Sequence, residues 1–169
     1  MNKIKWGIIG SGNIANAFAH SVKYCQDSEL VSVFGRNEEA VKQFSTKFAI
    51  EPYTNLDTFF SSDQIDAVYI ATPHSSHFTY SLEAIKNSKH ILCEKPLTMN
   101  YLESMTLLNL AKEAKVFLME AYMYRTHPQT FNILDHLDLF KNTQEKIFIE
   151  SSFGFAADLP KEHRLRNPL

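Results

Sequence analysis

Short apolar runs alternate along the chain with longer segments in which apolar residues recur with helical period. The runs are residues 4–9, 30–34, 67–71, 90–93 and 116–119. Runs this short and this apolar are typical of parallel strands buried on both faces. The stripes between them fall at steps of three and four residues, as on amphipathic helices: Ile14, Phe18 and Val22; Val41, Phe44 and Phe48; Phe78, Leu82 and Ile85; Tyr101, Met105, Leu108 and Ala111. This alternation predicts an α/β fold, a doubly wound parallel sheet with helices on both faces.

The pattern changes after residue 121. A helical stretch over 129–140 is followed by strict alternation over 145–155, which predicts one long strand of an open sheet. We therefore expect a nucleotide-binding domain at 1–121 and, at 122–169, the first helix and strand of a second, α+β domain that looks truncated. A long strand with an exposed edge favours pairing with another copy, so we expect a homo-oligomer formed through it.

Composition narrows the class of protein. The chain has 169 residues, and its hydrophobic fraction of 44% is typical of a globular protein. Its formal net charge of −2 gives no sign of a bulk basic face for nucleic acid. No apolar run is long enough to span a membrane. The two cysteines, Cys25 and Cys93, lie far apart and fit a reducing compartment, so we expect a cytoplasmic protein.

A glycine-rich motif follows the first predicted strand and opens the first helix. In it, Gly10 allows a tight turn, Gly12 lets a pyrophosphate approach the backbone, and Ala15 lets the helix pack closely on the sheet. The free N–H groups around Asn13 and Ile14 then bind the anion. The motif predicts dinucleotide binding; the alternative is a glycine turn that binds nothing.

Arg36 stands just past the second predicted strand, where an NAD site of this type would carry Asp or Glu for the ribose. An arginine there can pair with a 2′-phosphate and stack on adenine, which favours NADP(H). NAD remains the alternative, with Arg36 as a solvated surface residue, because Glu38 and Glu39 follow closely.

Polar residues follow three later strands, and ligands in such sheets bind at the carboxyl ends of the strands. Lys95 is the candidate catalytic residue, because an ammonium near a cationic nicotinamide is destabilised and can exchange a proton. The alternative is a surface ion pair between Lys95 and Glu94. His74 and His77 have no third ligand at suitable spacing, so we expect no metal; they line the cofactor edge or cap the following helix.

Four segments in order, GIIGSGNIA, IATPHSSH, CEKPLT and MEAYMYRTHP, resemble the Gfo/Idh/MocA oxidoreductases, and the last is most similar to the dimeric dihydrodiol dehydrogenase branch. The resemblance implies a Rossmann domain followed by an α+β domain. It also implies hydride transfer between a nicotinamide cofactor and a sugar, polyol or cyclic diol.

The resemblance further assigns roles to individual residues. It matches Lys95 to the family's EKP lysine, whose bond to the proline (here Pro96) is often cis. The cofactor contacts that it implies or matches are Thr72, His74, His77, Glu94, Lys95 and Arg125.

The family's GG-x-x-x-D-x-G-x-[HY] segment, which supplies an acid and a His or Tyr, is missing before Leu169. We therefore expect an incomplete catalytic set and an inactive chain. The alternative is a non-catalytic dinucleotide-sensing module, or a degenerate or cleaved product.

Overall fold

The computed structural model describes residues 3–138, 146, 148, 150–152 and 154. The chain divides into two compact units after Thr126, rather than after Ala121 as the sequence pattern suggested. The residues between belong to the first unit because they turn back on the end of its last strand: the Tyr122 N–H donates to the Glu120 carbonyl, and the Arg125 N–H to that of Tyr122. Each helix among the described residues is too short or too polar to span a bilayer.

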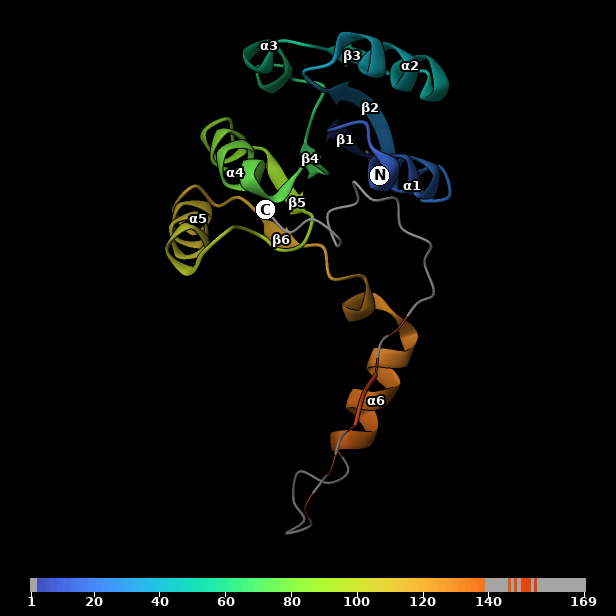
Figure 1. Ribbon diagram of the computed structural model, residues 1–169, viewed down its shortest axis with the longest axis vertical. Coiled ribbons are helices and arrows are strands. Elements are labelled where there is room, and N and C mark those ends of the chain that lie inside the picture. Colours follow the sequence, from blue (N-terminus) through green and yellow to red (C-terminus); the bar gives the residue numbers. More distant parts are fainter. Residues whose placement is uncertain (1–2, 139–145, 147, 149, 153, 155–169) are drawn as a thin grey trace. The chain divides into compact units, whose positions relative to one another are not determined.

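The first unit is built on a six-stranded sheet in the order β3-β2-β1-β4-β5-β6, with every neighbouring pair parallel (Figure 1). This is the doubly wound Rossmann order, which confirms the predicted fold class. The strands are β1 (Ile4–Ile9), β2 (Ser28–Phe34), β3 (Glu51–Tyr53), β4 (Ala67–Ile70), β5 (His90–Cys93) and β6 (Leu118–Glu120).

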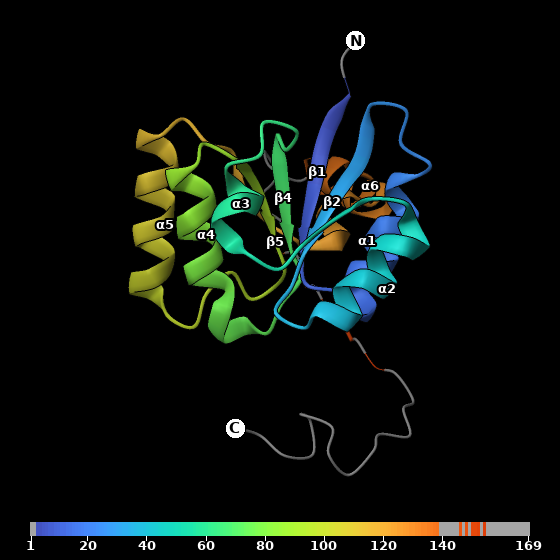
Figure 2. The same cartoon turned by 90° about the horizontal axis from the view of Figure 1, so that it is seen from above.

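Helices cover both faces of the sheet, and Figure 2 shows α1 and α2 on one side and α3, α4 and α5 on the other. Their bounds are α1 (Asn13–Val22), α2 (Glu38–Phe48), α3 (Leu56–Phe60), α4 (His77–Lys86) and α5 (Tyr101–Glu113). Two apolar cores result. Ile8 of β1 packs in the core beneath α1 and α2, and its neighbour Ile9 packs in the opposite core; neither is exposed. The strand runs read as apolar throughout because both faces are covered.

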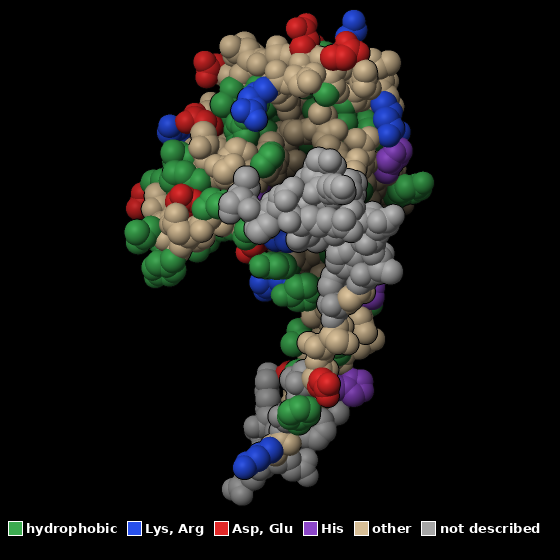
Figure 3. Space-filling view, in the orientation of Figure 1, with side chains coloured by type: hydrophobic (Ala, Val, Ile, Leu, Met, Phe, Trp, Pro, Cys, Tyr) green, Lys and Arg blue, Asp and Glu red, His purple; other side chains and the backbone are tan. Residues whose placement is uncertain are grey.

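Two of the predicted apolar stripes do not fully coincide with the buried face of their helix. On α5, Tyr101, Met105 and Leu108 are 73%, 36% and 46% exposed, whereas Leu107 and Ala111 are buried. Figure 3 shows apolar side chains exposed over this helix. Because α5 carries apolar residues on two faces, periodicity alone does not select the one that meets the sheet.

On α1, Ile14 is exposed, and the helix meets the sheet through Ala15, Ala19 and Val22. Small residues at Ala15 and Ala19 let the helix lie close to the strands. Of the predicted stripe, Val22 is buried and Phe18 packs half-buried against the same core, so only Ile14 departs from the prediction. The stripe of Val41, Phe44 and Phe48 on α2 is buried as predicted.

In the second unit the structure describes α6 (Pro128–Asp138), in agreement with the predicted helix as far as residue 138. Its first helical residue is a proline, a position where the missing N–H costs nothing. The His127 ring accepts a hydrogen bond from the Gln129 N–H at 3.1 Å. The predicted strand at 145–155 lies largely outside the described residues; those described, 146, 148, 150–152 and 154, are not in a strand.

Candidate functional site

The turn after β1 requires a glycine. Gly10 has φ +105°, a conformation that strains any side chain, and a Cβ built there would lie 2.8 Å from the Ala71 carbonyl oxygen. Its N–H donates to the Phe34 carbonyl at 2.8 Å. Gly10 thus lets the end of β1 lie tightly between the ends of β2 and β4.

The start of α1 is open. Gly12 occupies the N-cap position, no side chain caps the helix, and a Cβ at Gly12 would meet nothing within 4 Å. The N–H groups of Asn13 and Ile14 belong to the first turn, where backbone donors lack intrahelical partners. Open space beside uncapped donors at the positive end of a helix suits an anionic group, so the loop fits a pyrophosphate.

A cavity of about 300 Å³ lies beside this loop. The ends of β1, β2 and β4 form its walls, at the point where the strand order reverses between β1 and β4, which is where sheets of this kind bind ligands. Of the predicted cofactor-binding residues, Gly10, Gly12, Arg36 and Thr72 line it.

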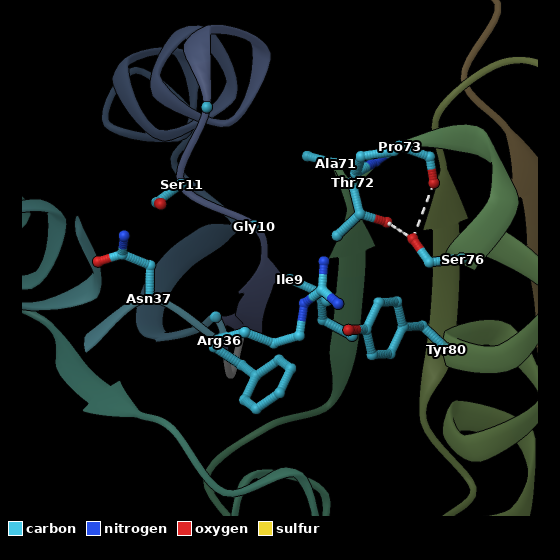
Figure 4. Close-up of a pocket in the computed structure, with 13 residues that line it drawn as sticks. Ile9, Gly10, Ser11, Arg36, Asn37, Ala71, Thr72, Pro73, Ser76 and Tyr80 are labelled. Atoms are coloured by element: carbon cyan, nitrogen blue, oxygen red, sulfur yellow. Dashed lines mark hydrogen bonds between the residues drawn. The ribbon is translucent and has the colours of Figure 1, made fainter. Parts of the chain in front are cut away.

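Arg36 and Tyr80 point into the cavity from opposite sides (Figure 4). The neighbouring Asn37 side chain is committed to capping α2, where it accepts from the Ala40 N–H at 3.0 Å. Tyr80 comes from α4, and its ring packs edge-on against Phe34 at 6.0 Å between centroids. A guanidinium and a phenol ring facing one cavity are suited to a flat, electron-rich ring carrying an anionic substituent.

Sequence reasoning missed Tyr80. The signal was its position: it follows His77 by three residues and so lies on the same side of a helix that starts at a strand end.

The loop after β4 is held by its own hydroxyl groups. The Ser76 hydroxyl hydrogen-bonds to Thr72 Oγ1 at 2.8 Å and to the Pro73 carbonyl oxygen at 2.7 Å (Figure 4). These contacts fix the side of the cavity that faces the glycine loop.

His77 has a position that its predicted role did not anticipate. Its side chain is fully buried, with Nδ1 2.8 Å from the Pro96 carbonyl oxygen and Nε2 2.9 Å from that of Thr72. A buried ring with both nitrogens at carbonyl oxygens is not available to touch a ligand. The structure therefore gives His77 a positioning role, joining the loop after β4 to the loop after β5.

His74 lies in the short 3₁₀ helix before α4 and packs edge-on against the His77 ring, 5.6 Å between centroids. In the described part of the chain, no three His, Cys, Asp or Glu residues lie close enough together to hold a metal ion.

Glu94 and Lys95 lie at the end of β5, the next strand from the cavity. The Glu94 carboxylate accepts from the Tyr69 hydroxyl at 2.6 Å and from the Lys95 backbone N–H at 3.3 Å. This arrangement replaces the Glu94–Lys95 side-chain ion pair considered from the sequence. The Lys95 side chain is exposed, and its bond to Pro96 is cis, as the resemblance implied.

The end of β6 supports the same loop. Glu120 Oε1 accepts from the Leu97 N–H at 2.8 Å, and the Glu120 carboxylate raises the pKa of the nearby Tyr122 hydroxyl. Tyr122 and Tyr124 pack against each other with centroids 5.6 Å apart. Arg125 is exposed in the turn Met123–Thr126 and does not line the cavity. The structure thus collects Glu94, Lys95 and Glu120 on adjacent strand ends, beyond the cavity.

Comparison with known proteins agrees with this architecture. Trans-1,2-dihydrobenzene-1,2-diol dehydrogenase of Xenopus tropicalis is 33% identical over 153 residues, which are 89% of this chain and 46% of that protein. D-xylose 1-dehydrogenase (NADP(+)) of Hypocrea jecorina is 30% identical, over 98% of this chain and 47% of that protein. This chain therefore spans about half the length of these relatives.

Among solved structures, KijD10, a 3-ketoreductase from Actinomadura kijaniata in complex with NADP, superposes with a TM-score of 0.76 at 31% identity, over 82% of this chain and 44% of that one. The sequence also matches, over residues 4–122, the profile of the oxidoreductase family with an NAD-binding Rossmann fold. The chain belongs to the Gfo/Idh/MocA oxidoreductase family.

Proposed function

We propose that this chain binds NADP(H) in the cavity between the ends of β1, β2 and β4, as the nucleotide-binding half of an oxidoreductase. The observation that carries the proposal is the uncapped start of α1, where a Cβ at Gly12 would meet only open space. A pyrophosphate placed there is bound by backbone N–H groups and favoured by the helix dipole.

Arg36 supports NADP(H) over NAD(H) in this proposal. It lines the same cavity at the end of β2, where a carboxylate would repel a 2′-phosphate. Two of the compared proteins point the same way: one is named as NADP(+)-dependent, and KijD10 was solved with NADP. NAD(H) is the alternative cofactor.

A bound nicotinamide would accept or supply hydride at the carboxyl ends of β4 and β5. On this reading Thr72, His74 and Glu94 shape that end of the site, Arg125 approaches it from the turn after β6, and Lys95 exchanges the proton of the reacting hydroxyl. The proposed substrate is a sugar, polyol or cyclic diol, in line with the names of the two relatives.

Titration of the 169-residue chain with NADPH and NADH tests the proposal. Trp6, the single tryptophan, lies on β1, so its emission reports a nicotinamide bound at the ends of the neighbouring strands. We expect saturable binding of both, tighter for NADPH, confirmed by calorimetry. If neither cofactor binds, the proposal is wrong; tighter binding of NADH would establish the alternative.

Two further expectations belong to this proposal. The first is self-association through residues 145–155, to be measured by sedimentation velocity at high concentration. The second is a cytoplasmic location, which the two free thiols, Cys25 and Cys93, support.

A further inference from the structure

The side chain of Asn16 binds the backbone of the glycine loop, residues 10–12, at the start of α1. This residue lies in the first turn of α1, and its Nδ2 lies 3.0 Å from the Gly12 carbonyl oxygen and 3.3 Å from that of Ser11. The two carbonyl groups that bracket the phosphate-facing glycine therefore share one amide. The Gly12 carbonyl also accepts from the Asn16 backbone N–H at 3.0 Å, so both carbonyls are hydrogen-bonded on the helix side of the loop.

Lys47 determines which way the Asn16 amide points. Its Nζ, from the last turn of α2, donates to Asn16 Oδ1 at 2.7 Å. An ammonium group has only donors, so the amide oxygen must face Lys47 and the amide NH₂ must face the loop. Without this lysine the amide can turn over and place its oxygen against two carbonyl oxygens.

The Lys47 side chain is exposed, but a contact with an aromatic ring restricts the position of its ammonium group. Its Nζ lies 5.2 Å from the centroid of the Phe48 ring, which is buried between α1 and α2. The ring favours a cation on its face and limits where the ammonium sits. The Lys23 Nζ, at the end of α1, lies at the same distance from this ring, so two ammonium groups share it and the ring favours the position of the Lys47 ammonium without fixing it alone.

We infer that Lys47 and Asn16 are positioning residues of the phosphate loop: Lys47 orients the Asn16 amide, and the amide holds the Ser11 and Gly12 carbonyls so that the backbone N–H groups remain turned toward the anion. The inference rests on the proposed function. Neither residue lines the cavity, so both act through the loop. The competing explanation is a link that merely joins α1 to α2.

Replacing Lys47 separates these two explanations. In Lys47→Met the amide loses its charged donor while the aliphatic stem is retained. We expect binding of NADPH and of NADH to weaken by the same factor, about tenfold, because both carry a pyrophosphate. Binding of 2′-AMP, which carries the 2′-phosphate and the adenine but no pyrophosphate, should be unchanged.

Further variants of the full chain serve as controls. Lys47→Arg keeps a donor-only cation and should restore most of the affinity, whereas Asn16→Leu removes both loop contacts and should give a loss at least as large as Lys47→Met. Lys42→Met, on the same helix and also exposed, should bind all three ligands like the unmodified chain.

The outcomes distinguish this inference from the proposed function. If the unmodified chain binds neither dinucleotide, the proposed function fails and this inference fails with it. If it binds both and Lys47→Met binds them equally well, the inference alone is wrong. An equal loss for 2′-AMP, together with a lowered melting temperature, would also overturn it in favour of a simple helix–helix link.

Discussion

The Tyr69 hydroxyl donates to Glu94 Oε1 at 2.6 Å, which ties the centre of the sheet to the carboxylate beside the candidate catalytic lysine. Tyr69 is buried in β4, and its ring stacks on Phe18 with centroids 4.0 Å apart. Burial and the Glu94 carboxylate both raise the pKa of Tyr69, so the hydroxyl remains a donor. Because Glu94 also accepts from the Lys95 N–H, the bond fixes the start of the loop that presents Lys95.

Tyr69→Phe should lower the free energy of unfolding by about 1–2 kcal/mol, since it removes one hydrogen bond to a partly exposed carboxylate. The phenyl ring keeps the stack on Phe18, so packing should be preserved. Urea unfolding followed by circular dichroism measures the difference. Tyr24→Phe, in which the parent residue is 89% exposed, is the matched control. Equal stability of the two variants would mean that the Tyr69 bond contributes nothing.

The sheet could be predicted because each long strand is buried on two sides and therefore reads as an apolar run. β3 escaped this reasoning because its residues, Glu51, Pro52 and Tyr53, form no apolar run, whereas the equally short β6 overlaps one. The proline is tolerated because β3 is an edge strand, where one side of the backbone needs no partner. The short helix α3, capped by Asn55, was missed with it because five residues carry too little periodicity.

The candidate site was predictable only where its chemistry is local. Gly10, Gly12 and Arg36 stand at strand ends that the sequence reveals, and they meet in one cavity. His77 was different: its spacing suggested a ligand contact, but each of its two ring nitrogens lies at hydrogen-bonding distance from a carbonyl oxygen of a separate loop. Such contacts depend on how distant segments pack, which periodicity does not encode. Tyr80, by contrast, had a local signal in its position three residues after His77 on the helix that starts at a strand end.

Alkaline pH should destabilise the fold through Cys93. Burial raises the pKa of this thiol from 9.0 to about 12, with smaller effects from Ser81, which lowers it, and from Glu94 and Glu120, which raise it. The folded thiol then keeps its proton at a pH where the unfolded one has lost it. Its stabilising contribution is complete below pH 9, and it is lost as the pH rises toward 12, with a slope of up to about 1.4 kcal/mol per pH unit.

Cys93→Val should therefore flatten the decline of the unfolding free energy between pH 9 and pH 11, whereas Cys25→Ser, at an exposed position, should leave it unchanged. Urea unfolding at several pH values in the presence of a reductant measures both slopes. A Cys93→Val slope as steep as that of the unmodified chain would show that other groups control the alkaline transition.

Substitutions at Gly10 and Gly12 should separate folding from binding. Gly10→Ala places a Cβ 2.8 Å from the Ala71 carbonyl oxygen at φ +105°, so we expect a loss of about 1–3 kcal/mol in the free energy of unfolding. In Gly12→Ala the new Cβ meets nothing within 4 Å, so the free energy of unfolding should fall by only about 0.5–1 kcal/mol, the cost of alanine in place of glycine at an N-cap, while cofactor binding weakens strongly. Denaturation and calorimetry on both variants test the contrast. Unaltered affinity in Gly12→Ala would place the pyrophosphate elsewhere.

Arg36→Ala should weaken NADPH binding by about 1.5–3 kcal/mol and leave NADH binding nearly unchanged, because only NADPH offers the 2′-phosphate for a charge-assisted, bidentate contact. Arg36→Lys keeps the charge but loses the planar fork, so its affinity for NADPH should lie between that of the unmodified chain and that of Arg36→Ala. The guanidinium is exposed at the mouth of the cavity, so the NADPH preference of the unmodified chain should shrink as salt rises. Calorimetric titrations at low and high ionic strength measure both effects. Equal losses for the two cofactors would assign Arg36 to the shared adenine ring instead of the phosphate.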